Sequence, residues 1–193
     1  MMFSPAYLSA LLVEPLRFFF ENFGGEDLTW SSDLKKTSIE IDTINNFNKI
    51  AVQAKPRILV SRGQYNMSPT GLNDNLAQAK DSFPNRGSTS VANMVMVQGV
   101  AQVMVEARNE GTCEKIVDLV QHFLVWSGPM IAGSQGFKNF GQAINVSPCT
   151  PTRDDTEIFQ CTFNIPWSKE EHWVVSSKDN ISMKSFLLNI SKK

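Results

Sequence analysis

The longest regular pattern in the chain runs from Ser88 to Met130 and predicts a β segment followed directly by an amphipathic helix. Residues 91–107 fall into two alternating sets, as the residues of an extended chain do. Because a single strand of this length exceeds the usual strand, Gly99 is expected to mark a bulge, a sharp bend or a change of partner.

The helix is predicted from apolar residues that recur three and four positions apart. Residues 109–112 (Asn-Glu-Gly-Thr) supply turn chemistry and a candidate N-cap. The apolar stripe consists of Cys113, Ile116, Val117, Val120, Phe123 and Leu124. Gly128-Pro129 is expected to end the helix, and residues 130–138 are expected to form a glycine-rich connection.

A second apolar helix is predicted over residues 5–23, with Ser4 as N-cap and Pro5 in the first turn. Proline lacks a backbone N–H and its ring collides with the preceding turn. Pro15 is therefore expected to kink the helix or to split it into two short helices. Gly24-Gly25 is expected to end it.

Shorter segments complete the fold. Alternation predicts strands at 37–44, 57–63, 140–146 and 157–165, with 47–54 as a continuation of the sheet. Residues 64–90 are rich in Asn, Gln, Ser, Gly and Pro, which indicates a long loop or flap. The predicted fold is α+β: a mixed, mostly antiparallel sheet with two helices packed on one face and a long loop insertion. A single domain over 1–175 and a polar tail over 176–193 are expected.

Composition and charge narrow the function classes. Apolar residues make up 42% of the chain and charged residues 19%, which suggests extensive subunit contact, although an ordinary globular protein fits equally well. The net charge of −1 argues against a general nucleic-acid binder. The apolar stretch 7–23 contains Glu14, Pro15 and Arg17 and lacks a basic leader, so neither a signal peptide nor a membrane span is expected. The chain is expected to be cytosolic and soluble.

The cysteines offer little chemistry. Three cysteines at wide spacing do not make a disulfide framework, and they fit a reducing compartment. Cys113 lies in phase with the apolar stripe of the helix, which favours core packing over a reactive thiol. Cys149 and Cys161 flank a predicted turn, and a cross-link between them is a second interpretation.

Other candidate catalytic groups are equally sparse. His122 is expected to be a partly buried structural residue beside Phe123, and His172 is expected at the surface. Neither histidine has a metal-ligand spacing. Asp154-Asp155 is ordinary turn composition, and the glycine motifs of phosphate and dinucleotide sites are absent. No catalytic, cofactor-binding or metal-ligating residue is predicted, and no cofactor.

The order of these elements resembles the tail terminator and tail-completion proteins of long-tailed bacteriophages and the related neck proteins at the head-to-tail joint. The likeness rests on Lys55 to Val60, on the run Val95 to Asn109 leading into Glu114 to Trp126, and on Glu157 to Ile165 with Trp173 shortly after. The long insertion 64–90 and the tail 176–193 depart from the family pattern.

The resemblance implies a structural virion protein without catalytic activity. Such proteins form a ring, usually of six subunits, that caps the tail tube and joins it to the neck or connector proteins. Genomic DNA passes through the bore without sequence-specific binding, and no membrane is involved. The expected location is the tail or neck of the virion, after assembly in the host cytoplasm.

One side of the predicted strand 91–107 is a candidate contact surface. The alternation places Met94, Met96, Val100 and Met104 on the same side, and thioether side chains adapt to imperfectly matched surfaces. Together with the loop 64–90, which includes Asn85 and Arg86, this stripe is expected to contact the next subunit or the tail tube, because sheet edges invite pairing. In the alternative interpretation the same stripe faces the main helix inside the subunit.

Two rival functions remain open. One belongs to the same structural class: a head-completion or other neck protein. The other is a small α+β enzyme or ligand-binding domain that uses the cleft between sheet and helix, with its cysteines and histidines as the reactive groups.

Overall fold

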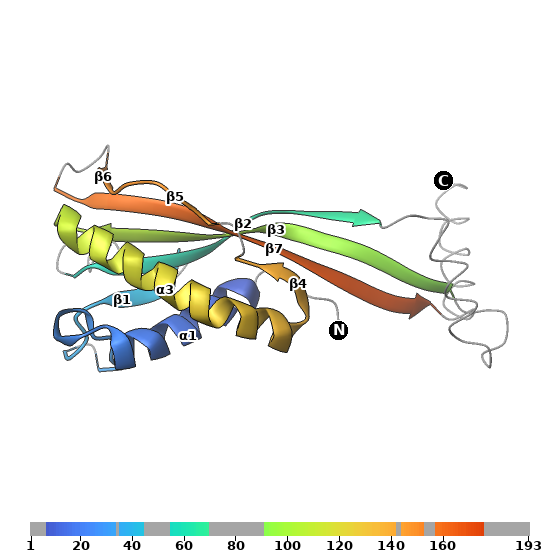
Figure 1. The fold of residues 1–193 in the computed structure, drawn as a ribbon, viewed down its shortest axis with the longest axis horizontal. Helices are drawn as coiled ribbons and strands as arrows, with labels where there is room; N and C mark the ends of the chain where they lie inside the picture. The colour runs from blue at the N-terminus through green and yellow to red at the C-terminus, as the bar shows by residue number, and fades with distance from the viewer. Residues whose placement is uncertain are drawn as a thin grey trace, which may run out of the picture. The chain divides into compact units, whose positions relative to one another are not determined.

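Strand β3 (Val91–Ala107) extends over the whole alternating segment and lies inside the sheet, between two other long strands (Figure 1). The computed structural model describes residues 7–33, 35–44, 55–69, 91–141, 144–152 and 157–175. The other elements, in chain order, are α1 (Tyr7–Phe23), the 3-10 turn η1 (Glu26–Leu28), β1 (Glu40–Thr43), β2 (Arg57–Pro69), α3 (Glu110–Gln135), β4 (Phe137–Phe140), β5 (Asn145–Val146), β6 (Thr150–Pro151) and β7 (Phe159–Val175).

The described strands form one mixed sheet in the order β1-β2-β3-β7-β4, and β5 and β6 also pair with β7. Strand β1 runs parallel to β2, while β4, β5 and β6 run antiparallel to β7. Figure 1 shows both helices on one face of this sheet. The predicted α+β class, with a mostly antiparallel sheet and two helices on one face, is confirmed.

The chain divides into two compact units. The first consists of Met1–Asn66 and Gln98–Lys169 and contains both described helices. The second consists of Met67–Val97 and Glu170–Lys193, and its described residues are the ends of β2, β3 and β7. The surfaces analysed below lie in the first unit.

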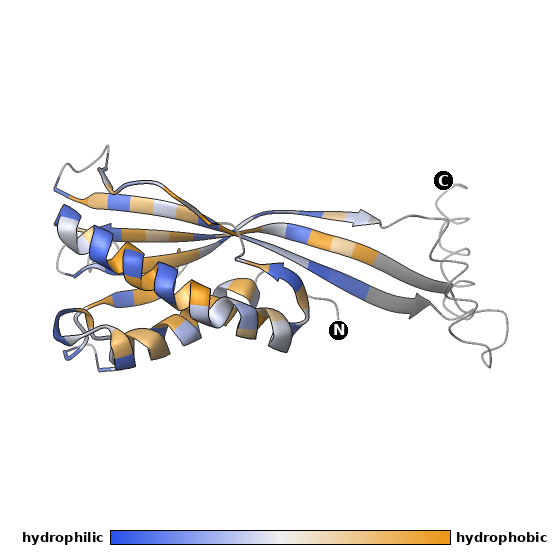
Figure 2. Ribbon diagram, viewed as in Figure 1, coloured by the Kyte–Doolittle hydropathy of each residue, from blue (hydrophilic) through white to orange (hydrophobic). Residues whose placement is uncertain are grey.

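The core of the first unit is built by the face of the sheet that α1 and α3 cover. Helix α1 buries one stripe, which consists of Leu8, Leu12, Val13, Leu16 and Phe20. In β7 every second residue is buried, namely Cys161, Phe163, Ile165 and Trp167. Figure 2 shows apolar and polar bands alternating along β7 in the part that lies over the helices. This one-sided burial is what period-2 patterning predicts.

Helix α1 is one continuous helix with Pro15 inside it, so the predicted split into two short helices is wrong. Pro15 removes one backbone hydrogen bond. Leu12 and Leu16 on either side of it are buried, and this packing holds both halves of the helix on the same core.

Helix α3 also passes through a proline, so the predicted end at Gly128-Pro129 is wrong. Gly128 and Ile131 are buried, and a Cβ on Gly128 would lie 3.6 Å from the carbonyl oxygen of Phe140 in β4. This packing stabilises the helical conformation on both sides of Pro129, which lacks a backbone N–H. The helix ends at Gly136, whose left-handed φ of 67° suits glycine.

The predicted N-cap of α3 is confirmed. The side-chain oxygen of Asn109 accepts hydrogen bonds from the backbone N–H groups of Gly111, at 2.8 Å, and Thr112, at 3.4 Å. These are two of the donors that the first helical turn leaves without a helical partner.

Gly99 marks a close approach of two strands within the continuous β3. A Cβ on Gly99 would lie 2.6 Å from Cβ of Tyr65 and 2.7 Å from the carbonyl oxygen of Gln64, both in β2. Across the same pair of strands, a Cβ on Gly63 would lie 2.6 Å from the carbonyl oxygen of Val100. These two glycines allow the two backbones to approach where any side chain would collide.

Several predicted boundaries need correction. Strand β2 continues to Pro69, so residues 64–69 are strand and not loop. Strand β7 begins at Phe159 and continues to Val175, well past the predicted end at Ile165, and β4 pairs with it from Trp167 to Lys169. Strand β1 is shorter than 37–44, and the segment predicted as 140–146 is divided between β4 and β5. Residues 47–54, 70–90 and 176–193, with Asn85 and Arg86, lie outside the described residues.

Candidate functional site

Two residues of the predicted contact stripe, Val100 and Met104, lie on the face of the sheet away from the helices. The buried residues of β3 are the alternate set, including Ala101, Val103 and Val105, which are 0% exposed. Val100 and Met104 are half-buried and point to the other face. The interpretation that these two side chains face the main helix is therefore wrong. Met96 is half-buried and belongs to the second unit, and Met94 lies in β3 with its side chain outside the described residues.

Strand β3 is not an edge of the sheet, contrary to the expectation that it offers an unpaired edge to a neighbour. Strand β3 lies between β2 and β7, so its backbone groups pair within the sheet and do not form an edge. If residues such as Val100 and Met104 meet a partner, they do so through their side chains.

Cross-strand contacts show which residues share this face. Arg57 in β2 pairs with Glu106 in β3, and the hydroxyl of Ser61 donates to the side-chain oxygen of Gln102 at 3.5 Å. From the first of these pairs to the second, the residue number rises in β2 and falls in β3, so the two strands are antiparallel. On the other side, the side-chain amide of Gln160 in β7 contacts the sulfur of Met104.

We call this surface of the first unit the open face, because no described element covers it. It is defined by Ser61, Tyr65, Gln98, Val100, Gln102, Met104, Gln160, Thr162, Asn164, Pro166 and Ser168. None of these side chains carries a formal charge. Exposed sheet faces normally carry charged residues, whereas the cores of protein interfaces are depleted in charge. The composition of the open face therefore fits a contact surface.

A buried ion pair stands at one end of the open face. The guanidinium of Arg57 forms two contacts with the same carboxylate oxygen of Glu106, and the two side chains are only 7% and 12% exposed. Removing either partner would leave an uncompensated charge at this buried position. It links β2 to β3 and is not available to an outside partner.

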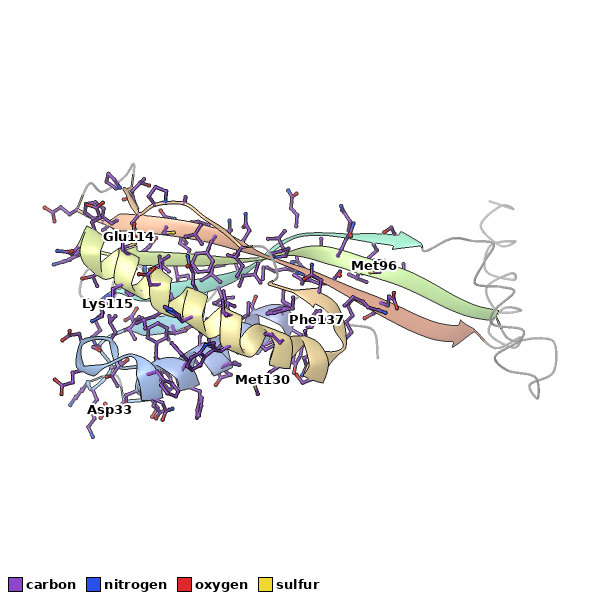
Figure 3. The ribbon with its side chains drawn as sticks, in the orientation of Figure 1. Asp33, Met96, Glu114, Lys115, Met130 and Phe137 are labelled. Carbon is purple, nitrogen blue, oxygen red and sulfur yellow. A yellow bond between two sulfur atoms is a disulfide. The ribbon has the colours of Figure 1, made fainter. Side chains whose placement is uncertain are left out.

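The outer surface of the helical layer carries large apolar side chains that the helical periodicity of α3 did not predict to be exposed. The five most exposed large side chains on α1 and α3 are Phe18 (65%), Phe23 (59%), Val125 (71%), Trp126 (70%) and Met130 (74%). We call these five residues the helix patch. Figure 3 marks Met130 on the second half of α3, and Lys115 near its start. The available signal was that Val125, Trp126 and Met130 are apolar but out of phase with the buried stripe.

Two contacts show that α1 and α3 are antiparallel neighbours. The rings of Phe19 and Phe123 lie 5.5 Å apart, centroid to centroid. Near the start of α3, the ammonium of Lys115 lies 3.6 Å from the carboxylate of Asp27, just past the end of α1. Both helices therefore contribute exposed side chains to the outer surface of the helical layer.

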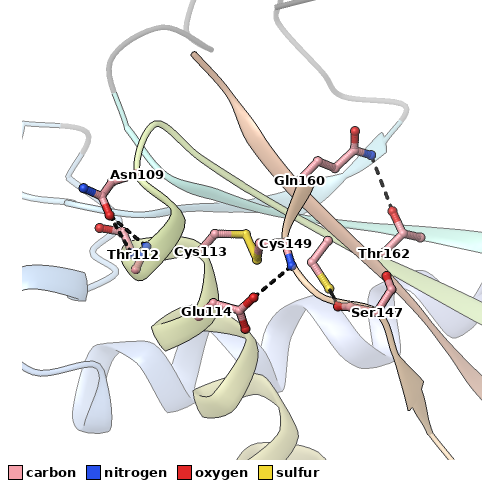
Figure 4. Close-up of a disulfide and its surroundings, with 10 residues drawn as sticks. Asn109, Thr112, Cys113, Glu114, Ser147, Cys149, Gln160 and Thr162 are labelled. Atoms are coloured by element: carbon pink, nitrogen blue, oxygen red, sulfur yellow. Dashed lines mark hydrogen bonds between the residues drawn. A yellow bond between two sulfur atoms is a disulfide. The ribbon is translucent and has the colours of Figure 1, made fainter. Parts of the chain in front are cut away.

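A disulfide joins Cys113 in the first turn of α3 to Cys149, with Cα atoms 6.3 Å apart (Figure 4). Cys149 therefore pairs with Cys113, and the suggested link between Cys149 and Cys161 is wrong. The carboxylate of Glu114 accepts a hydrogen bond from the backbone N–H of Cys149 at 2.8 Å, which holds the same segment against the helix.

Cys161 is a free, buried thiol next to this bridge. Its sulfur donates to the carbonyl oxygen of Ser147 at 3.0 Å. Burial, assisted by the negative charge of Glu114, raises the pKa of the Cys161 thiol, although the hydrogen bond to Ser147 opposes the shift. The thiol therefore stays protonated at neutral pH and is a poor nucleophile.

The remaining candidates do not converge on a reaction centre. His122 is exposed on α3, so the expected partial burial is wrong, and the side chain of His172 lies outside the described residues, as do Asp154 and Asp155. Among the described residues, no group of three His, Cys, Asp or Glu side chains could hold a metal ion. No described helix is long and apolar enough to cross a membrane.

One groove in the first unit could hold a small polar molecule. It has a volume of about 420 Å³ and is lined by residues of β2, β3, β4 and β7, including Tyr65, Gln98, Asn139 and Ser168. The side-chain oxygen of Asn139 is buried and has no hydrogen-bond partner among the described residues. A donor group entering the groove would satisfy this oxygen.

No protein-family model and no curated protein sequence matches this chain. The functional argument therefore rests on the surfaces of the chain itself.

Proposed function

We propose that this chain is a structural virion protein that forms a ring, with six subunits, on the end of a phage tail tube and joins the tube to the neck. Its partners are then further copies of itself, the tail tube protein and the neck or connector proteins. Genomic DNA passes through the bore without sequence-specific contact, which agrees with a net charge of −1. The proposed location is the tail or neck of the virion, after assembly in the host cytoplasm.

The observation that supports this proposal is a pair of chemically different surfaces on opposite sides of the sheet in the first unit. The open face presents amide, hydroxyl and thioether groups, and the helix patch presents large apolar groups. Ring assembly uses head-to-tail contacts, which need two different surfaces on every subunit.

The first test measures the mass of the purified chain by native mass spectrometry, with negative-stain electron microscopy of the same sample. A closed ring of six copies is expected. A chain that stays monomeric at micromolar concentration, or that grows into open filaments, contradicts the proposal.

The second test adds the ring to isolated tail tubes and, separately, to heads that carry a portal. Binding to the tubes alone is expected of a tail terminator. Binding to the heads alone would assign the chain to the rival role of a head-completion or other neck protein.

The groove beside Asn139 favours a second candidate function, a small-molecule-binding domain. Measurements on the same sample distinguish the two candidate functions. A monomer whose thermal unfolding is raised by a neutral polar ligand, and in which Asn139→Ala abolishes the shift, would support the second candidate over the ring.

A further inference from the structure

The helix patch is large for a surface that meets only water. Its five side chains each expose more than half of their area. At roughly 100 Å² of exposed surface per large side chain, the patch covers on the order of 500 Å². Soluble monomers rarely expose a contiguous apolar patch larger than this, and a standard interface buries about 800 Å² on each partner. The helix patch would therefore supply somewhat more than half of one partner's share of a standard interface, and the residues around it would have to supply the rest.

The open face is a suitable counterpart. Its residues carry no formal charge, and its half-buried Val100 and Met104 lie among amide side chains. A sheet face without charged groups accepts a helical layer readily, which is how α1 and α3 already cover the other face of the same sheet. Because the two surfaces differ, contact between them propagates from copy to copy. Contact of the helix patch with itself would stop at two copies.

The two strands at the ends of the strand order, β1 and β4, are less suited to assembly. Strand β1 has only four residues, and the carbonyl oxygen of Ile41 in it already accepts a hydrogen bond from the side chain of Arg17 at 3.0 Å. Strand β4 at the other end of the strand order also has only four residues. Short, partly satisfied edges protect a sheet from pairing with another chain.

We propose that the helix patch of one copy packs against the open face of the next copy, and that this is the head-to-tail contact of the ring. This inference rests on the proposed function for the existence of the ring, and it goes further by assigning the two surfaces that build it. Trp126 and Met130 insert between the side chains around Val100 and Met104 of the neighbouring subunit.

The test uses two variants that each disable one surface. Trp126→Glu/Met130→Glu places two carboxylates in the helix patch, and Gln98→Glu/Asn164→Glu places two on the open face. All four positions are exposed, so the core of the subunit is unaffected. Arg108→Glu is the matched control. It lies at an exposed position outside both surfaces and, like the two variants, shifts the net charge from −1 by two units, to −3.

Mass photometry and circular dichroism are recorded for each variant alone and for a 1:1 mixture of the two. Each double variant should be folded and monomeric, and Arg108→Glu should form rings like the unchanged chain. The mixture should form dimers and nothing larger, because one intact helix patch can meet one intact open face, while the two remaining surfaces are both disabled.

Three results would overturn the inference. They are rings formed by either double variant alone, a mixture that stays monomeric, and a mixture that forms species larger than dimers. A failure of the proposed function is distinguishable, because the unchanged chain would then itself form no ring. If the unchanged chain forms rings and the double variants do so too, the ring stands and only the assignment of its surfaces is wrong.

Discussion

Gly99 and Tyr65 lie so close across β3 and β2 that a Cβ added to Gly99 would come within 2.6 Å of the Cβ of Tyr65. Real Cβ atoms do not approach so closely, and the neighbouring atoms belong to the backbone and to the root of a side chain. We expect Gly99→Ala to destabilise the protein by about 1–3 kcal/mol, as overpacking does. Chemical denaturation followed by circular dichroism measures this change.

Gly133 provides the matched control. It lies inside α3, and a Cβ there would meet nothing within 4 Å. Gly133→Ala should therefore raise the free energy of unfolding by about 0.5–1 kcal/mol, because alanine has the better helix propensity and restricts the unfolded chain. A stabilising effect of Gly99→Ala as well would mean that the two strands do not approach at this point.

Phe123 anchors α3 between the sheet and α1. It is 4% exposed, and its ring lies 5.5 Å from that of Phe19. Phe123→Ala should lower the free energy of unfolding by about 3–5 kcal/mol. Lys115→Ala, on the exposed side of the same helix, should cost under about 0.5 kcal/mol, because its ion pair with Asp27 is solvated. Equal effects of the two substitutions would show that the helix is rotated from the orientation described.

The disulfide should be detectable by peptide mapping under non-reducing conditions. A linked pair of peptides containing Cys113 and Cys149 is expected, with Cys161 recovered as a free thiol. Cys149→Ser should lower the free energy of unfolding by about 2–4 kcal/mol, because the bridge restricts the unfolded chain. Recovery of a peptide pair linked through Cys161 would contradict this pairing.

The buried thiol of Cys161 should make stability depend on alkaline pH. Burial raises its pKa above the ordinary value of 9.0, so the folded chain keeps the thiol proton at pH values where the unfolded chain has lost it. Its contribution is fully present below the ordinary thiol pKa, and it declines as pH rises through the pKa of the folded state.

Comparing urea denaturation at pH 7.5 and pH 10 for the unchanged chain and for Cys161→Ala measures this contribution. The unchanged chain should lose more stability between the two pH values than the variant does. The same loss in both would assign the alkaline sensitivity to other groups.

Much of the fold follows from local pattern. The alternation along 91–107 requires only that neighbouring residues point to opposite sides of an extended chain, and β3 has the predicted extent. The Asn109 cap and the stripe through Cys113, Ile116 and Phe123 follow from helix geometry alone, and both are confirmed. These features depend on residues within a turn or two of one another, so a single sequence contains the information.

Other features depend on contacts between residues far apart in the chain. Helix α3 crosses Pro129 because Gly128 packs on β4, and β7 extends to Val175 because β3 and β4 pair with it. Cysteine spacing did not indicate the partner of Cys113, because the bridge depends on where β7 holds the segment around Cys149.

Local sequence pattern alone also could not predict the two surfaces of the candidate site. Strand parity placed Val100 and Met104 together on one face, but two interpretations of that face were open until the helices were seen to cover the opposite side. Trp126 and Met130 are exposed because the sheet and α1 occupy only one side of α3. Periodicity groups the residues that share a face. The packing of distant elements then sets which face is covered, because burial is a property of the whole assembly of elements and not of any one of them.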